Sequence, residues 1–154
     1  MGSRAVTAPL PISHWPAAPG QVSVSGARLR IRALIAMGHS TDRIARALGD
    51  RASARSVQRI ARGDTTKIPP SLRARISRLY EAWWDLVPPE GTATERHAAA
   101  AARRWARWHR WCTGMGLDDD LLDEPDYDPH CAWRPATGTG VATGNPLKVR
   151  RPYR

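Results

Sequence analysis

The sequence has no phenylalanine and two cysteines, and it contains no apolar run long enough to span a membrane, which takes about 20 apolar residues. It also shows no apolar N-terminal stretch of the kind that forms a signal peptide. One pair of cysteines without such a signal is typical of reduced thiols in a cytosolic protein. The sequence therefore predicts a cytoplasmic protein that has no membrane contact.

Enzyme motifs are also missing, since no nucleophile elbow, phosphate-binding loop or dinucleotide fingerprint occurs. His109, Cys112, His130 and Cys131 are residue types that bind zinc, but adjacent ligands such as the last two rarely complete one tetrahedron. The acidic run 118–128 could bind two Mg²⁺ ions for nuclease chemistry, but it is contiguous, broken by proline and lacks the glycine of an EF-hand loop. We therefore expect no enzyme, catalytic residue, metal, cofactor or small-molecule ligand.

Positive charge is abundant and unevenly placed. The formal net charge is +10 and the sequence pI is about 11.1. Residues 28–78 hold 13 Lys and Arg against three Asp, whereas residues 79–129 hold five Arg against 11 Asp and Glu. The basic excess therefore lies in one segment, which favours a polyanionic partner for that segment.

Arginine supplies almost all of this charge, because Lys67 and Lys148 are the only lysines among 24 basic residues. Arginine suits bidentate contacts to phosphate and guanine. Codon bias in a GC-rich genome explains most of the excess, and it indicates an actinobacterium or its phage as the source.

The stretch 40–63 predicts two short helices joined by a tight turn. Each half carries apolar residues at helical spacing, so each helix has one buried face. Gly49 ends the first helix where the backbone needs a positive φ, and Ser53 is a good N-cap for the second. The motif core is Ile44, Ala45, Leu48, Gly49, Val57 and Ile60.

This pattern resembles the helix-turn-helix of bacterial repressors and recombinases. In the common form an apolar residue follows the glycine, whereas here Asp50 follows it and Val57 comes eight residues after Gly49, so the turn is about two residues longer. The resemblance implies that the second helix lies in the major groove of double-stranded DNA. The expected base-reading residues are Arg55, Ser56, Gln58 and Arg59, and the expected phosphate-binding residues are Arg51, Arg62 and Lys67. The alternative is an ordinary αα-hairpin in a helical bundle.

The rest of the chain predicts three more helices and two tails, hence an all-α protein. The helices are expected at 27–37, 70–86 and 93–112, and the helix-turn-helix makes a three-helix core with the first of them. We divide the chain into a disordered arm (1–25), a helix-turn-helix domain with its supporting fourth helix (26–88), a Trp/Arg-rich helix with an acidic segment (89–133) and a disordered basic tail (134–154).

For three surfaces the sequence allows more than one contact partner. The apolar face of 70–86 covers the three-helix unit, or part of it forms a homodimer through the Trp-bearing helices. Trp105, Trp108 and Trp111 share a broad face of the fifth helix, which docks on the core or meets nucleic acid, a partner or a membrane surface. The acidic segment 118–128 contacts basic helices of its own chain or a basic partner.

From about residue 28 to residue 126 the order of features is similar to a group of short helix-turn-helix proteins of actinobacteria and their phages. The similarity lies in the sequences 44–49 and 60–63, in Leu79-Tyr80 with Trp83-Trp84, and in the acidic run. It implies DNA binding and transcriptional control in the nucleoid, or in the host cytoplasm for a phage protein. Two alternatives stay open: a phage accessory such as a terminase small subunit or recombination directionality factor, and a protein-interaction module.

Overall fold

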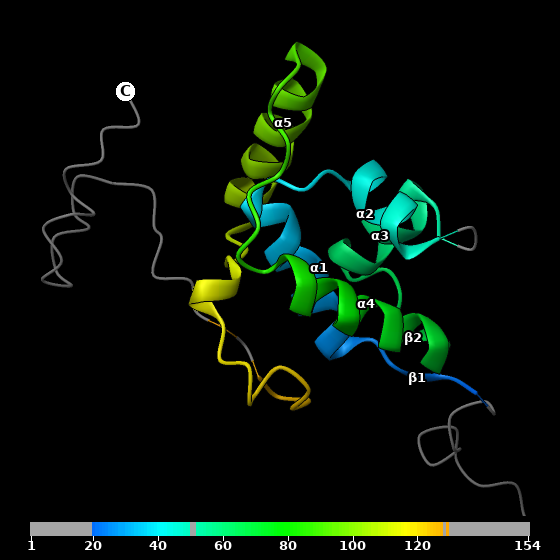
Figure 1. Ribbon diagram of the computed structural model, residues 1–154. Helices are drawn as coiled ribbons and strands as arrows, with labels where there is room; N and C mark the ends of the chain where they lie inside the picture. The colour runs from blue at the N-terminus through cyan, green and yellow to red at the C-terminus, as the bar shows by residue number, and fades with distance from the viewer. Residues whose placement is uncertain (1–19, 50–51, 128, 130–154) are drawn as a thin grey trace, which may run out of the picture.

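The computed structural model describes residues 20–49, 52–127 and 129, and most of them lie in five α-helices (Figure 1). The elements in chain order are β1 (Val22–Ser23), α1 (Ser25–Met37), α2 (Thr41–Leu48), α3 (Ala54–Arg62), β2 (Lys67–Ile68), α4 (Pro70–Trp83), α5 (Ala93–His109) and the 3-10 turn η2 (Gly114–Gly116). The predicted all-α class is therefore confirmed. Residues 1–19 of the predicted arm and the predicted tail 134–154 lie outside the described residues.

Side-chain caps begin α2, α3 and α5. Ser53 accepts a hydrogen bond from the backbone N–H of Ser56 at 3.1 Å, as the sequence predicts. Ser40 caps α2, and Thr92 caps α5 in a capping box with Glu95. Each satisfies backbone donors that a helix leaves unpaired at its first turn. The predicted helix ends at Gly38, Gly49 and Gly63 are also confirmed.

Three helix boundaries differ from the prediction. α1 begins at Ser25, two residues early, and α4 ends at Trp83 rather than at residue 86. α5 ends at His109 rather than at Cys112, because Arg110 takes a left-handed conformation with φ of 59°. Trp111 therefore lies beyond the helix, and Trp108 is 84% exposed, so the three tryptophans do not share one helix face.

Helix α1 is the centre of the core. Ile31, Leu34 and Ile35 are fully buried, and α1 packs against α3, α4 and α5. Figure 1 shows α4 crossing α1, with α2 and α3 to one side. On α5 the residues that face the core are the small Ala99, Ala102 and Ala106, which allow a close approach of the two helices.

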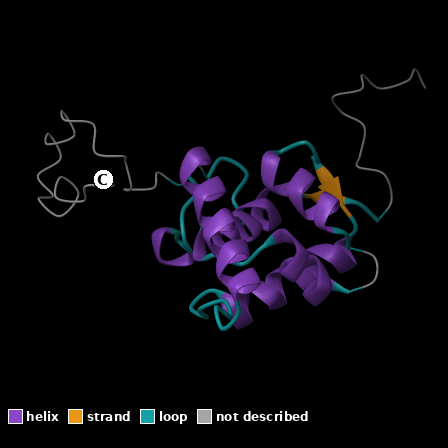
Figure 2. Ribbon diagram, turned by 90° about the horizontal axis from the view of Figure 1, so that it is seen from above, coloured by secondary structure: helices purple, strands orange, loops and turns teal. Residues whose placement is uncertain are grey.

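A short strand pair joins the start of α1 to the connection between α3 and α4 (Figure 2). Val22 pairs with Ile68 and Ser23 with Lys67 in antiparallel register. Val24, which follows β1, is buried, and its N–H donates to Thr66 O at 3.1 Å. The predicted disordered arm 1–25 is therefore wrong for residues 22–25, which belong to β1 and to the start of α1.

The segment after α5 packs against the first helices rather than forming a separate unit. Leu122 is 1% exposed and belongs to the same hydrophobic core as Ile31 and Ile76. Ala102 and Ala106 of α5 belong to it as well. The predicted divisions 26–88 and 89–133 therefore share one core.

His39 lies in the turn between α1 and α2, and its side chain is fully buried. The Nε2–H of His39 donates to Leu86 O at 3.0 Å, and its Nδ1 accepts from Arg43 Nε at 3.3 Å, because a guanidinium can only donate. The ring stacks on Trp83 with centroids 4.8 Å apart. Burial lowers the pKa of His39, outweighing the bond to Leu86, and the charges of Arg43 and Arg103 lower it further. The histidine is therefore neutral at pH 7.

Candidate nucleic-acid interface

Helices α2 and α3 form a packed hairpin built on the predicted motif core. Ile44, Leu48 and Val57 are at most 2% exposed, and Ala45 and Ile60 are also buried. The apolar spacing read from the sequence therefore identifies the faces that these two helices bury against each other, with α3 also packing on α1 and α2 on α4.

The turn between the two helices starts at Gly49, which has the predicted positive φ, at 93°. Its ψ of −174° places it in a region that only glycine adopts readily. The N–H of Ala52 donates back to Gly49 O at 3.0 Å. Asp50 and Arg51, a predicted phosphate-binding residue, lie outside the described residues.

Three arginines form one exposed stripe on α3. Arg55, Arg59 and Arg62 follow each other at i, i+4 and i+7, so they lie on the same side of the helix. Together with Gln58 and Asp64 they line a shallow hollow. None of the ion pairs found in the described part of the chain involves these three arginines. The stripe brings together two predicted base-reading residues and one predicted phosphate-binding residue.

The other two predicted base-reading residues bond within the protein. Ser56 shares a hydrogen bond of 2.9 Å with the N-cap Ser53. Gln58 is half-buried, and its Nε2 donates to Thr41 Oγ1 of α2 at 3.4 Å. The structure therefore presents Arg55 and Arg59 more openly than Ser56 and Gln58. Lys67, the remaining phosphate-binding candidate, is exposed in β2.

Other arginines satisfy the carbonyl groups at helix C-termini. Arg75 Nη1 donates to Leu48 O of α2 at 2.5 Å, and Arg32 Nε donates to Ala61 O of α3 at 2.7 Å. Arg103 Nε donates to Met37 O of α1 at 3.3 Å. The last carbonyls of a helix lack intrahelical partners and carry partial negative charge, so a guanidinium stabilises them. Arg75 therefore has a structural role at the end of α2.

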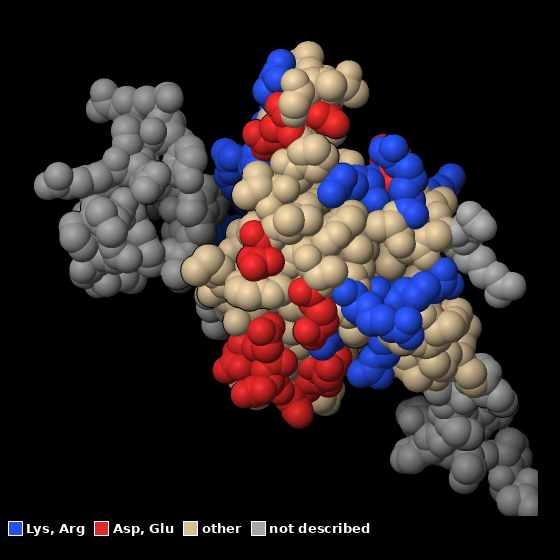
Figure 3. All heavy atoms as spheres, viewed as in Figure 1, with Lys and Arg blue, Asp and Glu red and all other residues tan. Residues whose placement is uncertain are grey.

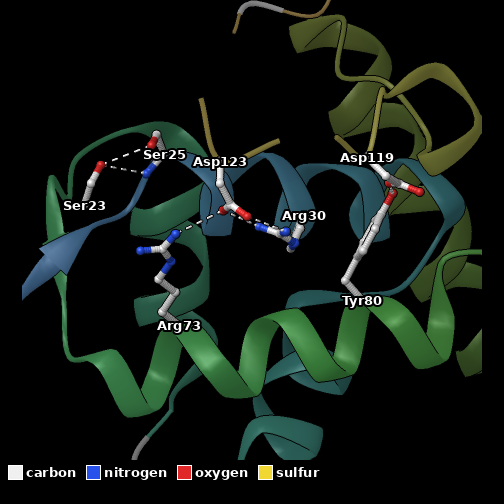
Figure 4. Close-up of polar contacts among 7 residues, drawn as sticks. All are labelled: Ser23, Ser25, Arg30, Arg73, Tyr80, Asp119 and Asp123. Carbon is white, nitrogen blue, oxygen red and sulfur yellow. Dashed lines mark hydrogen bonds and ion pairs between the residues drawn. The ribbon is translucent and has the colours of Figure 1, made fainter. Parts of the chain in front are cut away.

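The acidic segment contacts its own chain, which is one of the two alternatives left open by the sequence. Asp123 forms a bidentate pair with Arg30, at 2.8 and 2.9 Å, and a further pair with Arg73 at 3.3 Å (Figure 4). The hydrogen bond from Arg30 lowers the pKa of Asp123, and Asp123 raises that of Arg30. The charge of Arg73 is thereby partly neutralised.

Gly26 and Tyr80 provide the rest of this docking site. A Cβ at position 26 would collide with Oδ1 of Asp123 and would lie 2.9 Å from Leu122 O, so the close approach requires glycine. Tyr80 OH donates to Asp119 Oδ1 at 3.3 Å, and burial together with Asp119 raises the pKa of Tyr80 to about 12. Sequence reasoning did not find this site, because nothing local links residues that are 93 positions apart.

The two signs of charge occupy different parts of the surface. Figure 3 shows acidic side chains gathered over the segment that follows α5, and Lys and Arg side chains over α2 and α4. Asp123 of the acidic segment pairs with Arg30 and Arg73, and none of the ion pairs among the described residues joins this segment to the arginine stripe on α3. Positive charge is therefore concentrated on the part of this face that carries α2 and α4.

The described residues offer no metal centre, since no three His, Cys, Asp or Glu side chains among them gather closely enough to hold an ion. Cys112 is disulfide-bonded, so the prediction of a reduced thiol at this position is wrong and the thiols no longer support a cytosolic location. His109 stacks on Trp111 with centroids 4.8 Å apart. His130 and Cys131 lie outside the described residues. No helix in the described part of the chain has the length and apolar character needed to cross a membrane.

Comparison with known proteins gives no relative: no family model, curated protein or solved structure matches the chain.

Proposed function

We propose that this protein binds double-stranded DNA through α3, with α2 and α3 acting as a helix-turn-helix and α3 lying in the major groove. The observation that carries the proposal is the stripe of Arg55, Arg59 and Arg62 on one exposed side of α3. The opposite side of α3 is held in the core by Val57 and Ile60, so the stripe faces outward. A guanidinium donates in pairs to phosphate or to the O6 and N7 atoms of guanine.

The distribution of the other arginines supports a binding role for this stripe. Arg30, Arg75 and Arg103 each bond to a carboxylate or to a helix terminus of the protein itself. The arginines of the stripe have no such acceptor in the hydrogen bonds of the described residues. A fold that employs so many arginines internally, yet leaves three in line on one helix, offers that line to an external anion.

The proposed role is sequence-specific regulation of transcription, in an actinobacterium or its phage. The arginines at 55 and 59 would read bases, while Arg62 and Lys67 would bind phosphates on either side. This finer role rests on the resemblance of the sequences 44–49 and 60–63 to short helix-turn-helix proteins, together with the exposure of Arg55 and Arg59.

The experiment is a salt titration of DNA affinity. If about six phosphates are neutralised, log K for a random-sequence duplex should fall against log salt with a slope near −5. Fluorescence anisotropy of a labelled duplex gives the slope. Two variants that lose the same charge are compared: Arg59→Ala in the stripe and Arg104→Ala as the control. Arg104 follows the buried Ala102 by two positions, so it projects from the opposite side of α5.

Arg59→Ala should weaken binding, and Arg104→Ala, which loses the same charge, should leave affinity within about twofold of wild type. A slope near zero for the wild type, or equal losses in the two variants, would contradict the proposal.

A further inference from the structure

An aromatic cluster lies at the C-terminal end of α5. Trp105 meets Trp111 edge-on, with ring centroids 4.7 Å apart, and His109 stacks on Trp111 at 4.8 Å. Trp105 also meets His109 edge-on at 5.9 Å. We call these three residues the α5 aromatic cluster.

The cluster depends on an unusual backbone conformation. Arg110 is the one non-glycine residue with positive φ in the described part of the chain, at 59°. This left-handed residue lets the N–H of Trp111 donate back to Ala106 O at 2.9 Å, so the chain reverses and Trp111 returns to Trp105. Arginine is rarely found in this conformation, where glycine or asparagine is more usual, and its side chain is exposed. Arg110 therefore places an exposed positive charge at a backbone position that arginine rarely occupies.

The cluster also holds two arginines from other helices. Arg62, the last member of the arginine stripe on α3, has its guanidinium carbon 5.8 Å from the ring centroid of Trp105. Arg32 of α1 lies 5.3 Å from the ring centroid of Trp111 and donates to Ala61 O at the end of α3. The end of α3 and the end of α5 are therefore neighbours, joined by arginine–tryptophan contacts.

Resting on the proposed function, we propose that the DNA-binding surface continues from α3 onto the end of α5, where Arg62 and Arg110 bind backbone phosphates that flank the base pairs read by α3. Trp105 is a positioning residue: its ring supports the guanidinium of Arg62 and limits the number of rotamers that Arg62 loses on binding. A guanidinium has five N–H donors, so its edge stays available to phosphate while its face lies over the ring. Arg110 is the C-cap residue of α5 and follows Trp105 by five positions.

The first experiment compares two arginines of α5 that differ in position. Arg110→Gln and Arg104→Gln each remove one charge, but Arg104 projects from the side of the helix opposite to Ala102. On a random-sequence duplex, Arg110→Gln should make the salt slope shallower by about one and weaken binding about fivefold to tenfold at 0.1 M salt. Arg104→Gln should keep the wild-type slope. A wild-type slope for Arg110→Gln, or the same change in both variants, overturns the proposal.

The second experiment tests the positioning role by a double-mutant cycle on DNA affinity. Trp105→Leu keeps an apolar side chain but removes the ring, and it should weaken binding about threefold to fivefold in the wild type and hardly at all in an Arg62→Ala background. Trp105→Phe should restore most of the affinity. Melting temperatures of all variants, measured by circular dichroism, show whether each is folded at the assay temperature. If Trp105→Leu loses the same factor with and without Arg62, the ring does not act through Arg62 and the proposal is overturned.

Failure of this inference can be told apart from failure of the proposed function. If the wild type binds DNA with a steep slope and Arg59→Ala weakens it while Arg110→Gln does not, α3 binds DNA and the end of α5 does not. If the wild type itself shows no salt-dependent binding, both proposals fail together. A partner protein at the end of α5 would produce the first of these outcomes.

Discussion

Arg30 and Asp123 form a bidentate ion pair between the central helix and the acidic segment that follows α5. The side chain of Arg30 is 9% exposed and that of Asp123 is 48% exposed. The pair therefore stands at the edge of the core, with a nearly buried cation under a half-exposed carboxylate. This arrangement makes the acidic segment part of the fold rather than a free tail.

Replacing Asp123 with Asn should destabilise the protein. The substitution leaves the nearly buried Arg30 without its counter-charge. We expect the free energy of unfolding to fall by about 1–2 kcal/mol. This is the low end for a charge-assisted pair, because Asp123 is half-exposed and solvent screens the interaction. Thermal unfolding followed by circular dichroism measures it. Asp126→Asn, an equal charge change at an exposed position, is the control, and equal melting temperatures for the two variants would contradict the structural role of Asp123.

Gly49→Val should strain the turn between α2 and α3. The φ of 93° and ψ of −174° are unfavourable for any residue with a Cβ, and a Cβ there would lie 3.3 Å from Arg75 Nη1, which bonds to Leu48 O. We expect a loss of about 2–3 kcal/mol in the free energy of unfolding. Gly91→Val is the control, because no positive φ is found there and its Cβ would meet only Glu95 Oε2 at 3.4 Å. An unchanged melting temperature for Gly49→Val would mean that the turn relaxes without strain.

The free energy of unfolding should fall as the pH drops below the ordinary pKa of histidine, about 6.5. Burial lowers the pKa of His39 in the folded protein. From about pH 6.5 downward, His39 is therefore protonated in the unfolded state while it stays neutral in the folded state. The free energy of unfolding is therefore constant near pH 7–8 and declines through pH 6 and 5. Urea unfolding at each pH measures it. The carboxylates with lowered pKa, Asp123 and Glu95, lose their contributions only at lower pH.

His39→Gln should flatten this decline, although it also lowers stability at pH 7 through the lost stacking on Trp83. His97→Gln, a change at an exposed histidine, should leave the profile as in the wild type. If the slope between pH 7 and pH 5 survives in His39→Gln, another group causes it.

Two variants should separate base reading from phosphate binding. On a DNA site selected from random sequences, Arg59→Ala should cost about 1–3 kcal/mol, and much less on random DNA, since only one charge is lost there. Lys67→Ala should weaken both DNAs alike and make the salt slope shallower by about one. Anisotropy titrations of each variant on each duplex give the four values.

An equal loss for Arg59→Ala on both duplexes would make Arg59 a phosphate contact. The longer turn after Gly49 offers the reason: it rotates α3 so that Arg55, one turn earlier in the same stripe, takes the base-reading place. Arg55→Ala measured on the same two duplexes then shows the selective loss.

Local signals in the sequence were enough to predict the helices and many of their ends. Ser53 and Gly38 act on backbone groups within a few residues of themselves, so their roles follow from position alone. The paired strands are two residues each, too short for any periodicity, and they were missed. α5 was predicted too long because nothing in its composition marks the left-handed Arg110.

Within the candidate site, only the exposure that follows from helical spacing could be predicted from the sequence. Arg55 and Arg59 lie opposite Val57, so their exposure was predictable. By contrast, Arg75 looked like another surface arginine, and only the folded chain brings it to Leu48 O of another helix. The sequence also gave no means of choosing Asp123 among the acidic residues as the partner of Arg30.

The position of α1 has a consequence for the order in which the protein is made. α1 is synthesised before the helices that bury it, and its contacts reach forward along the chain, from Met37 to Arg103 across 66 residues and from Arg30 to Asp123 across 93. During synthesis on a ribosome, the apolar face of α1 therefore cannot be fully buried until α5 and Leu122 have emerged. The nascent chain therefore exposes the apolar face of α1 until residue 123 has been synthesised, and this core can be completed only after that point.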